Sequence, residues 1–338
     1  MKSILKQVIG IDVAQKELVV AAGRLLSDLS KEIYAHRVFA NSEKGFAEML
    51  AWVKKLTDVN VSLQFIMEAT GVYHEKLAYY LTSKNHKVSI ILPNKISSYM
   101  RTLDIKTVTD KSCSEAITRF GLERSLEEWK QPSPIYRKIK QLTREREQIV
   151  EERTVVKNQK HAEETEAYPN KSSLKRMQER IKMLIRQEKE IKEEIAVLIA
   201  KDEETQRVVN LLCTIPGIGQ LTAAIILAET NGFELVRSRR QLASYAGLDI
   251  REKQSGTSVK GKPTISKRGN KYLRKAMHLP ALCAIRYNEK FKMLFGRLVS
   301  KHGIKMKAAV AVQRKQLELA YTLFKNNSRY KADYKGEL

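Results

Sequence analysis

The chain has 338 residues, of which 43% are hydrophobic, and its 62 Lys and Arg exceed its 38 Asp and Glu. This length predicts two or three domains, each with its own apolar core. No run reaches the roughly 18 apolar residues of a membrane span, and the start lacks the apolar segment of a signal peptide. The formal charge of +24 indicates a polyanionic partner. Nucleic acid is the expected one, and an anionic membrane surface is the alternative.

The charge and the cysteines are unevenly placed. Residues 205–338 hold 26 Lys and Arg against 8 Asp and Glu, so +18 of the net +24 lies there. This part of the chain is therefore expected to bind phosphate most strongly. Cys113, Cys213 and Cys283 are far apart and have no paired spacing. They favour a reducing cytoplasm and argue against structural zinc or disulfides.

Residues 1 to about 128 alternate between strand and helix patterns. Two strands that can form a hairpin, then a third strand and β-α-β units, predict a mixed sheet covered by helices. This is the ribonuclease-H-like arrangement. Strands are predicted at 6–14, 17–24, 32–40, 62–68 and 87–92, and helices at 42–57, 72–84, 94–102 and 111–128.

Two acids interrupt apolar strands in this region. Asp12 lies within the run 8–14, and Glu68 closes the run that begins at Phe65. A buried carboxylate without a partner is costly, so each needs a cation. Two acids side by side in one sheet would form a hard-oxygen site suited to Mg²⁺. The alternative is two isolated acids that cap helices or pair with Lys or Arg.

Residues 135–204 are rich in Lys, Arg, Glu and Gln and carry a heptad-like apolar seam. The seam predicts two long antiparallel helices that turn near Pro169 and serve assembly. One continuous helix kinked at Pro169 is the alternative. The seam residues are Ile135, Ile139, Leu142, Ile149 and Val156 in the first half, and Leu174, Met177, Ile181, Leu184, Glu188, Ile191, Ile195 and Leu198 in the second.

From residue 205 the pattern becomes helical with glycine-rich breaks. Ile215-Pro216-Gly217-Ile218-Gly219 matches a helix-hairpin-helix turn, in which the backbone N–H groups of Gly217 and Gly219 can hold a DNA phosphate. A tight turn without a ligand is the alternative. The hydroxyl-rich and basic segments 254–258 and 265–270 suit a loop that binds or attacks phosphate. A solvated basic loop is the alternative for them.

Together these segments resemble the DEDD transposases of the insertion sequence 110 family, which includes Piv-type DNA invertases. The resemblance implies a RuvC-like domain at 1–134, an antiparallel coiled-coil insertion at 135–204 and a mostly helical transposase domain at 205–330. It rests on Gly10-Ile11-Asp12-Val13, Glu68-Ala69-Thr70-Gly71, Asn94, Thr109-Asp110-Lys111, Ala116-Ile117, Arg119-Phe120-Gly121, Ile215 to Gly219, Ser244 to Leu248, Gln254-Ser255-Gly256, Ile265 to Asn270 and Leu273-Arg274.

The resemblance also implies a set of metal ligands. Asp12, Glu68 and Asp110 are expected to hold Mg²⁺, but the family's fourth acid falls at Cys113, and a thiol is a poor ligand for Mg²⁺. Either three acids are then enough, or Glu115 or a water takes the fourth place, or metal binding is weakened. Glu115 lies about 140° round the helix from Asp110, which makes it a poor geometric substitute.

A serine of the family's C-terminal domain becomes joined to DNA, and the matching residue is Ser255. Ser258 and Ser244 are lesser candidates, and Ser244 is expected to be a buried helix residue. A serine needs a base or metal and nearby cations to attack a phosphodiester. The Mg²⁺-bound acids would meet this need. The phosphate clamps would be Lys267, Arg268 and Arg274, each of which could instead be a surface cation.

The resemblance therefore implies an RNA-guided, serine-dependent DNA recombinase that moves its own insertion sequence. By the resemblance, its partners are donor and target DNA and a bridge RNA, and it works as a homodimer or homotetramer in the bacterial cytoplasm, at the nucleoid. One rival is a RuvC-like structure-specific nuclease that uses metal-activated water. The other is a non-catalytic nucleic-acid-binding relative in which Cys113 marks a decayed site.

Overall fold

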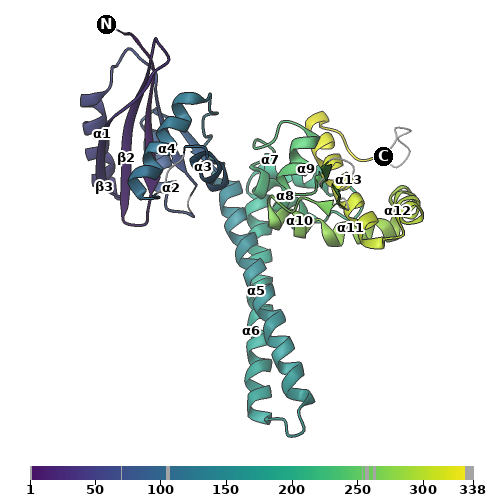
Figure 1. Ribbon diagram of the computed structural model, residues 1–338. Coiled ribbons are helices and arrows are strands. Elements are labelled where there is room, and N and C mark those ends of the chain that lie inside the picture. Colours follow the sequence, from purple (N-terminus) through teal and green to yellow (C-terminus); the bar gives the residue numbers. More distant parts are fainter. Residues whose placement is uncertain are drawn as a thin grey trace. The chain divides into compact units, whose positions relative to one another are not determined.

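The computed structural model describes residues 2–69, 71–103, 107–252, 254–255, 259–261 and 264–331, with the backbone alone at 254–255 and 259–260. The chain divides into two compact units, Met1–Gln131 and Pro132–Leu338 (Figure 1). The long helices that the sequence assigned to a separate region belong to the second unit. The division into three domains therefore stays a prediction.

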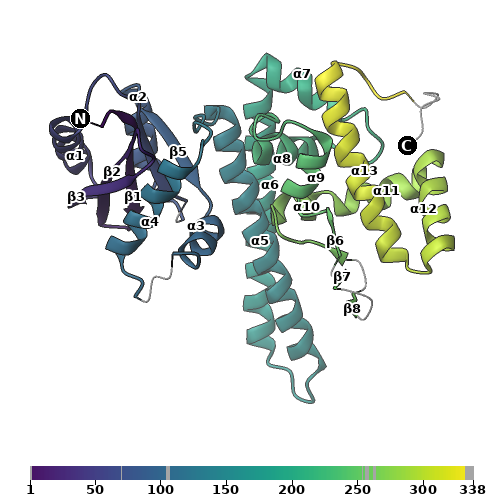
Figure 2. The same cartoon turned by 45° about the horizontal axis from the view of Figure 1, so that its top comes forward.

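A five-stranded mixed sheet forms the centre of the first unit, in the order β3-β2-β1-β4-β5 (Figure 2). β1 (Ile4–Val13), β2 (Glu17–Leu26) and β3 (Lys31–Ala40) are antiparallel neighbours. β4 (Leu63–Glu68) and β5 (Lys87–Ile91) run parallel to β1. Each strand ends within two residues of its predicted limits. The central strands are nearly continuously apolar because both faces of the sheet are covered.

Helices cover both faces of this sheet. α1 (Glu43–Leu56) and α2 (Glu75–Ser83) pack on one face, and α3 (Pro93–Met100) and α4 (Asp110–Glu123) pack on the other. Alternate residues of a strand point to opposite faces, so Ile9 joins the apolar cluster under α1 and α2, and Val8 joins the cluster under α3 and α4. The first cluster includes Ile9, Ile11, Phe46, Met49, Leu77 and Leu81, and the second includes Val8, Ile66, Ile96, Tyr99, Ile117 and Phe120.

The helix predicted at 111–128 is shorter than expected, because α4 ends at Glu123. Beyond it the chain is bonded to β5: the N–H of Trp129 donates to the Val88 carbonyl at 2.7 Å, and the Ser89 hydroxyl donates to the Glu127 carbonyl at 2.6 Å. Polar groups of a strand far away in the sequence thus bond to the Trp129 N–H and the Glu127 carbonyl, which would otherwise extend the helix. Local helix propensity cannot indicate this.

α4 runs antiparallel to β1 and very close to it. Near its C-terminus, the carbonyls of Gly121 and Arg124 accept hydrogen bonds from the Lys6 ammonium group. Near its middle, a Cβ added at Gly10 would lie 2.2 Å from Thr118 Oγ1 and 2.7 Å from the Ser114 carbonyl oxygen. Glycine at position 10 therefore permits the close contact that places the N-terminus of α4 beside the end of β1.

We expect Gly10→Ala to lower the free energy of unfolding by roughly 2–3 kcal/mol, because the added methyl group meets backbone atoms that cannot rotate away. Urea denaturation would measure the change. Gly296→Ala is the control, since a Cβ at that exposed helical glycine meets nothing within 4 Å. It should raise the free energy of unfolding by about 0.5–1 kcal/mol. An unchanged midpoint for Gly10→Ala would show that α4 shifts without cost.

The second unit begins with an antiparallel helical hairpin of α5 (Pro134–Thr165) and α6 (Lys171–Ala200) (Figure 1). Its turn contains Pro169, and the Asn170 side chain caps α6 by accepting hydrogen bonds from the N–H groups of Ser172 and Ser173. A single kinked helix is therefore excluded. The buried seam consists of Ile139, Leu142 and Val156 from α5 and of Ile181, Leu184, Glu188, Ile191 and Ile195 from α6.

Glu188 is the charged member of this seam. Its carboxylate accepts hydrogen bonds from Arg146 and Arg153 of α5, and Lys192 lies 2.8 Å from it. Burial by itself would raise the pKa of Glu188, but the bonds from Lys192, Arg146 and Arg153 outweigh this effect and lower the pKa to about 2. A pairing shifted along the seam would leave this carboxylate without its partners, so Glu188 specifies the register of the two helices.

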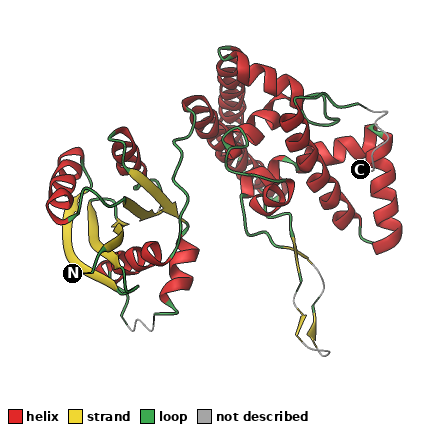
Figure 3. Ribbon diagram, turned by 90° about the horizontal axis from the view of Figure 1, so that it is seen from above, coloured by secondary structure: helices red, strands yellow, loops and turns green. Residues whose placement is uncertain are grey.

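Helices build the rest of the second unit around the base of the hairpin (Figure 3). Its core joins Ile139, Ile195 and Ile199 of the hairpin to Leu212, Leu227 and Leu317 of later helices. No helix among the described residues is long and apolar enough to span a membrane. The later helices are α7 (Glu203–Leu212), α8 (Gln220–Thr230), α9 (Arg239–Tyr245), α10 (Lys271–Ala276), α11 (His278–Tyr287), α12 (Glu289–His302) and α13 (Lys305–Asn326).

Two short ladders of strands lie between α9 and α10. β6 (Ile250–Arg251) pairs with β9 (Thr264–Ile265), and β7 (Gln254–Ser255) pairs with β8 (Val259–Lys260). All four strands belong to the segment 250–265, which we call the serine arm because it contains Ser255. Both ladders are antiparallel, and they are drawn in yellow beside the helices of this unit in Figure 3.

Candidate active site

Three predicted acids of the first unit come together at one edge of the sheet. The last parallel pair between β1 and β4 is Ile11 with Met67, so Asp12 and Glu68 are the next residues of two adjacent strands. Asp110 is the first residue of α4. The Thr109 side chain fixes this helix start by accepting a hydrogen bond from the N–H of Ser112 at 3.1 Å. The fold therefore brings together acids separated by up to 98 positions in the sequence.

The charges of the three acids interact. Burial, together with repulsion from Asp110 and Glu68, raises the pKa of Asp12 from 3.8 to about 6. The N–H of Val13 opposes the shift only in part. A carboxyl group whose pKa is raised by burial and by neighbouring carboxylates is typical of sites that bind a cation or transfer a proton.

Cys113 lies in the same group, one helical turn after Asp110. Burial and the charges of Asp12, Glu68 and Asp110 raise the pKa of its thiol to about 11. Glu115 is directed elsewhere, because its carboxylate lies 2.9 Å from His36 Nε2 on β3. The position of the missing fourth acid is therefore filled by a neutral thiol, and Glu115 is engaged with another strand.

The donor set of this edge fits a hard divalent cation. Three carboxylates supply oxygen ligands and an excess of negative charge, which is what Mg²⁺ prefers in proteins. The present side-chain positions do not form a complete shell: within the described ranges, no three His, Cys, Asp or Glu side chains are placed to hold a metal ion. The chemistry and charge of the site fit the ion, and the side chains would have to turn inward to bind it.

In the second unit, the glycine-rich turn joins α7 to α8, and its two candidate glycines differ. Gly217 has φ +87°, and a Cβ there would lie 2.2 Å from the Pro280 carbonyl oxygen, so this glycine permits packing against α11. Gly219 is exposed at the start of α8, and nothing lies within 4 Å of where its Cβ would be. Only Gly219 therefore has the open surroundings that a phosphate contact needs.

The three candidate phosphate clamps also differ. Lys267 and Arg268 are exposed on the segment that follows β9. Arg274 is half-buried, and its guanidinium donates to the Ala246 carbonyl at 2.8 Å. A Cβ at Gly247 would lie 2.7 Å from this guanidinium. Arg274 thus has an evident structural role, whereas Lys267 and Arg268 are open to a ligand.

A buried acid that sequence reasoning missed anchors this region. Glu229 of α8 is fully buried and accepts a bidentate pair of hydrogen bonds from Arg144 of α5, at 2.9 and 3.1 Å. It also accepts a bond from the Asn270 amide at 2.6 Å, and Asn270 caps α10. The available signal was an acid that closes the apolar run 223–228, the same kind of signal that singled out Glu68.

The structure places the candidate serines as follows. Ser255 lies in β7 of the serine arm. Ser258 lies outside the described residues. Ser244 is a helix residue of α9, but it is exposed rather than buried as predicted. The correction has a simple cause: α9 has only seven residues, and its buried face is formed by Leu242 and Ala243.

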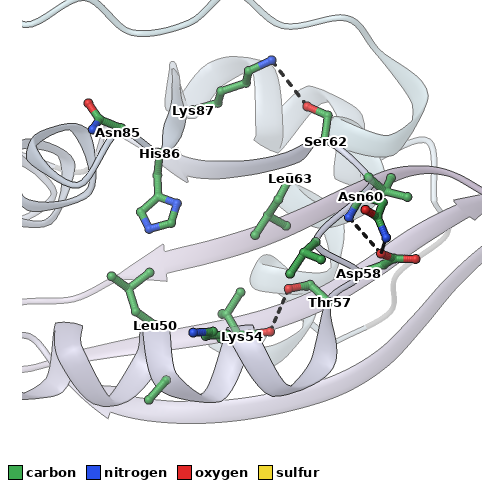
Figure 4. A pocket seen from close by; sticks show the side chains of 14 residues that line it. Leu50, Lys54, Thr57, Asp58, Asn60, Ser62, Leu63, Asn85, His86 and Lys87 are labelled. Atoms are coloured by element: carbon green, nitrogen blue, oxygen red, sulfur yellow. Dashed lines mark hydrogen bonds between the residues drawn. The ribbon is translucent and has the colours of Figure 1, made fainter.

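A hollow of about 580 Å³ in the first unit lies away from the acids. It is lined by the end of α1 and the beginnings of β4 and β5, and His86 in it is turned towards Leu50 (Figure 4). Leu63 of this hollow is the first residue of β4, whereas Glu68 is the last. The hollow is therefore at the opposite end of the strand, and we assign it no part in the chemistry.

Comparisons with known proteins cover nearly the whole chain. Residues 9–169 match a family model described as a transposase, of the DEDD type of the IS110 family, and residues 209–295 match one described as a transposase of the IS116/IS110/IS902 family. The pilin gene-inverting protein of Moraxella bovis is 31% identical over 328 residues, which is 95% of this chain and 97% of that protein. The transposase for insertion sequence element IS1328 of Yersinia enterocolitica is 27% identical over 253 residues, 66% of this chain and 70% of that protein.

Solved structures also match this chain, and one of them is a RuvC protein. T. thermophilus RuvC in complex with a Holliday junction substrate aligns with 34% of this chain and 97% of that chain, at 10% identity and a TM-score of 0.26. The family assignment does not depend on this match. It depends on the two family models, which together span both units, and on the near full-length relative. The chain belongs to the IS110 family of transposases.

Proposed function

We propose that this transposase cuts and rejoins DNA at a site formed by Asp12, Glu68 and Asp110, which hold Mg²⁺, together with Ser255. The observation that carries the proposal is the convergence of the three carboxylates at the ends of β1 and β4 and the start of α4, where burial and the two other charges raise the pKa of Asp12. The strand order β3-β2-β1-β4-β5, with its acids at the ends of β1 and β4, supports a RuvC-like, ribonuclease-H-like domain.

The serine step exchanges one phosphoester for another. The Ser255 hydroxyl oxygen forms a bond to phosphorus while the bond from phosphorus to the leaving strand oxygen breaks. The serine proton passes to a carboxylate of the acid group, and the leaving oxygen takes up a proton. No bond energy is lost, so the strand can be rejoined. Bound Mg²⁺ would act as a Lewis acid on the phosphate.

The second unit would bind the DNA backbone around this step. Gly219, Lys267 and Arg268 have the exposure that phosphate contacts need. Gly217 and Arg274 would contribute indirectly, by shaping the turn and the segment after β9. The α5–α6 hairpin would form a coiled coil that assembles a dimer or tetramer, so that two duplexes can be exchanged.

Guidance by a bridge RNA is the part of the proposal that rests on family resemblance alone. The test is to purify the protein from cells that carry its element, digest the DNA and sequence the RNA that remains bound. We expect one discrete RNA from the flank of the element, in the cytoplasm and at the nucleoid. Bound RNA that matches the total cellular pool would contradict guidance and leave the active-site proposal intact.

Restoring the fourth acid should strengthen metal binding. We expect Cys113→Asp to tighten Mg²⁺ binding by about tenfold or more, because a fourth carboxylate adds charge and a hard oxygen ligand. Isothermal titration calorimetry on the parent and the variant would measure it.

Cys113→Asn is the matched control, since it adds an oxygen of similar size without charge. It should change the affinity little. If Cys113→Asp binds Mg²⁺ no better than Cys113→Asn does, the thiol position does not face the metal.

A further inference from the structure

The bend between α12 and α13 carries a group of cations, Arg297, Lys301, Lys305 and Lys307, which we call the basic turn. All four side chains are exposed. Gly303, with φ +69°, ends α12 and reverses the chain direction between them. Where the structure describes possible partners, none of the four forms an ion pair, although neighbouring Lys292 and Arg314 do so with Glu289 and Glu318.

The charge of the basic turn is not balanced by the surrounding sequence. Residues 290–317 contain eight Lys and Arg and no Asp or Glu. The α5–α6 hairpin is different, because several of its exposed cations have acidic partners: Arg180 lies 2.6 Å from Glu152, and Lys138 lies 3.6 Å from Glu194. Clustered like charges repel one another and destabilise the fold, so an unbalanced cluster indicates a polyanionic ligand.

The dipoles of α12 and α13 do not explain why four cations gather in the basic turn. Lys301 lies in the last turn of α12, where a cation is favourable. Lys305 and Lys307 lie in the first turn of α13, where the helix dipole disfavours cations. That turn contains no acid, and Ile304 provides no side-chain cap. At least half of the basic turn therefore opposes the local helix electrostatics.

The surroundings of the basic turn leave it open to a large partner. α12 packs against α11 and α13 and lies at the edge of the second unit (Figure 2). Met293 precedes the basic turn, and Ile304 and Met306 flank Lys305; all three are exposed, with 64%, 46% and 61% of their surfaces accessible. Alternating cations and apolar side chains suit phosphates separated by sugars.

We propose that the basic turn binds the phosphate backbone of a nucleic-acid duplex and adds a holding contact outside the active site. The proposal uses the family assignment, because a transposase acts on DNA, and does not depend on the proposed roles of Asp12 or Ser255. The family model of the C-terminal part ends at residue 295, so the basic turn lies beyond the matched segment. Its ligand is the phosphate shared by DNA and RNA.

The test compares two variants that each lose four positive charges. Arg297→Gln/Lys301→Gln/Lys305→Gln/Lys307→Gln removes the basic turn. Lys175→Gln/Lys182→Gln/Arg186→Gln/Lys189→Gln removes exposed cations of α6 and serves as the control. Binding of the full chain to one 30-base-pair sequence, as duplex DNA and as duplex RNA, is measured by fluorescence anisotropy between 50 and 300 mM KCl without divalent metal. Circular dichroism checks that both variants are folded.

For the basic-turn variant, we expect the plot of log affinity against log salt to become shallower by about 3 to 4, because each lost phosphate contact removes about 0.9 from the slope. Its affinity at 100 mM KCl should fall at least about tenfold, and the control should stay within about twofold of the parent. A loss on DNA alone, on RNA alone or on both identifies the source of the phosphate. Equal losses in the two variants, an unchanged slope, or reduced binding to anionic vesicles alone would overturn the proposal.

Discussion

Asp12→Asn should abolish strand cleavage and at the same time stabilise the first unit. We expect cleavage to fall by roughly a thousandfold or more, because losing one ligand of the metal removes several kcal/mol of transition-state stabilisation. Without metal, we expect the free energy of unfolding to rise at pH 7 by about 1–3 kcal/mol. Asparagine has no charge to repel Glu68 and Asp110.

The direction of this change in the free energy of unfolding follows from the titration of the Asp12 carboxyl group. Because the pKa of Asp12 is raised to about 6, the folded protein holds this proton more tightly than the unfolded chain does. The resulting stability is fully present below about pH 3.8 and is lost as the pH rises through 6. Asp12→Asn should therefore unfold at a higher urea concentration than the parent at pH 7, with a smaller difference at pH 5.

Added Mg²⁺ distinguishes the loss of a metal ligand from the loss of one negative charge. The ion should raise the unfolding midpoint of the parent protein much more than that of Asp12→Asn. Glu48→Gln is the control, because it removes one exposed negative charge from α1. It should cleave DNA and respond to Mg²⁺ as the parent does. If Asp12→Asn cleaves DNA normally, the acids are not the metal site and the central proposal fails.

Ser255→Ala should remove the covalent bond between protein and DNA. We expect the adduct to disappear and recombination to fall by about 10⁴-fold or more, because no other group replaces a lost nucleophile. The affinity for uncut DNA should stay within about twofold of the parent. Denaturing gel electrophoresis after proteolysis of trapped complexes would detect the adduct as labelled DNA that carries a peptide.

Ser244→Ala is the matched control, since Ser244 is an exposed serine of the same unit. It should retain the adduct and recombination, and Ser258→Ala should do the same. Cleavage at the parent rate by Ser255→Ala would favour the rival nuclease, in which metal-activated water attacks the phosphate. If none of the parent, Ser244→Ala and Ser255→Ala rearranges DNA, the non-catalytic reading gains.

The central strands of the sheet were predictable from the sequence because β1, β2 and β4 are largely buried on both faces and appear as apolar runs. The site was predictable only in part. Asp12 and Glu68 interrupt such runs, but Asp110 begins a helix and has no apolar pattern of its own, so only the family resemblance indicated it. The close approach that positions Asp110 depends on Gly10, whose role becomes visible only once α4 is in place.

Other features depended on contacts that no local pattern contains. The end of α4 is set by β5, through Ser89 and Val88. The exposure of Ser244 depends on which side of a short helix faces the core. Glu229 had a local signal, an acid that closes an apolar run, but its importance lies in partners from α5 and from the start of α10.

The shared anchor at Glu229 has a mechanical consequence. One carboxylate is fastened on one side to Arg144, near the base of the long hairpin, and on the other to Asn270. Asn270 follows the serine arm, and its backbone N–H donates to the Tyr245 carbonyl just before that arm. The base of the hairpin and the two ends of the serine arm therefore share one buried anchor, so a displacement of the hairpin base would be passed on to the segment that contains Ser255.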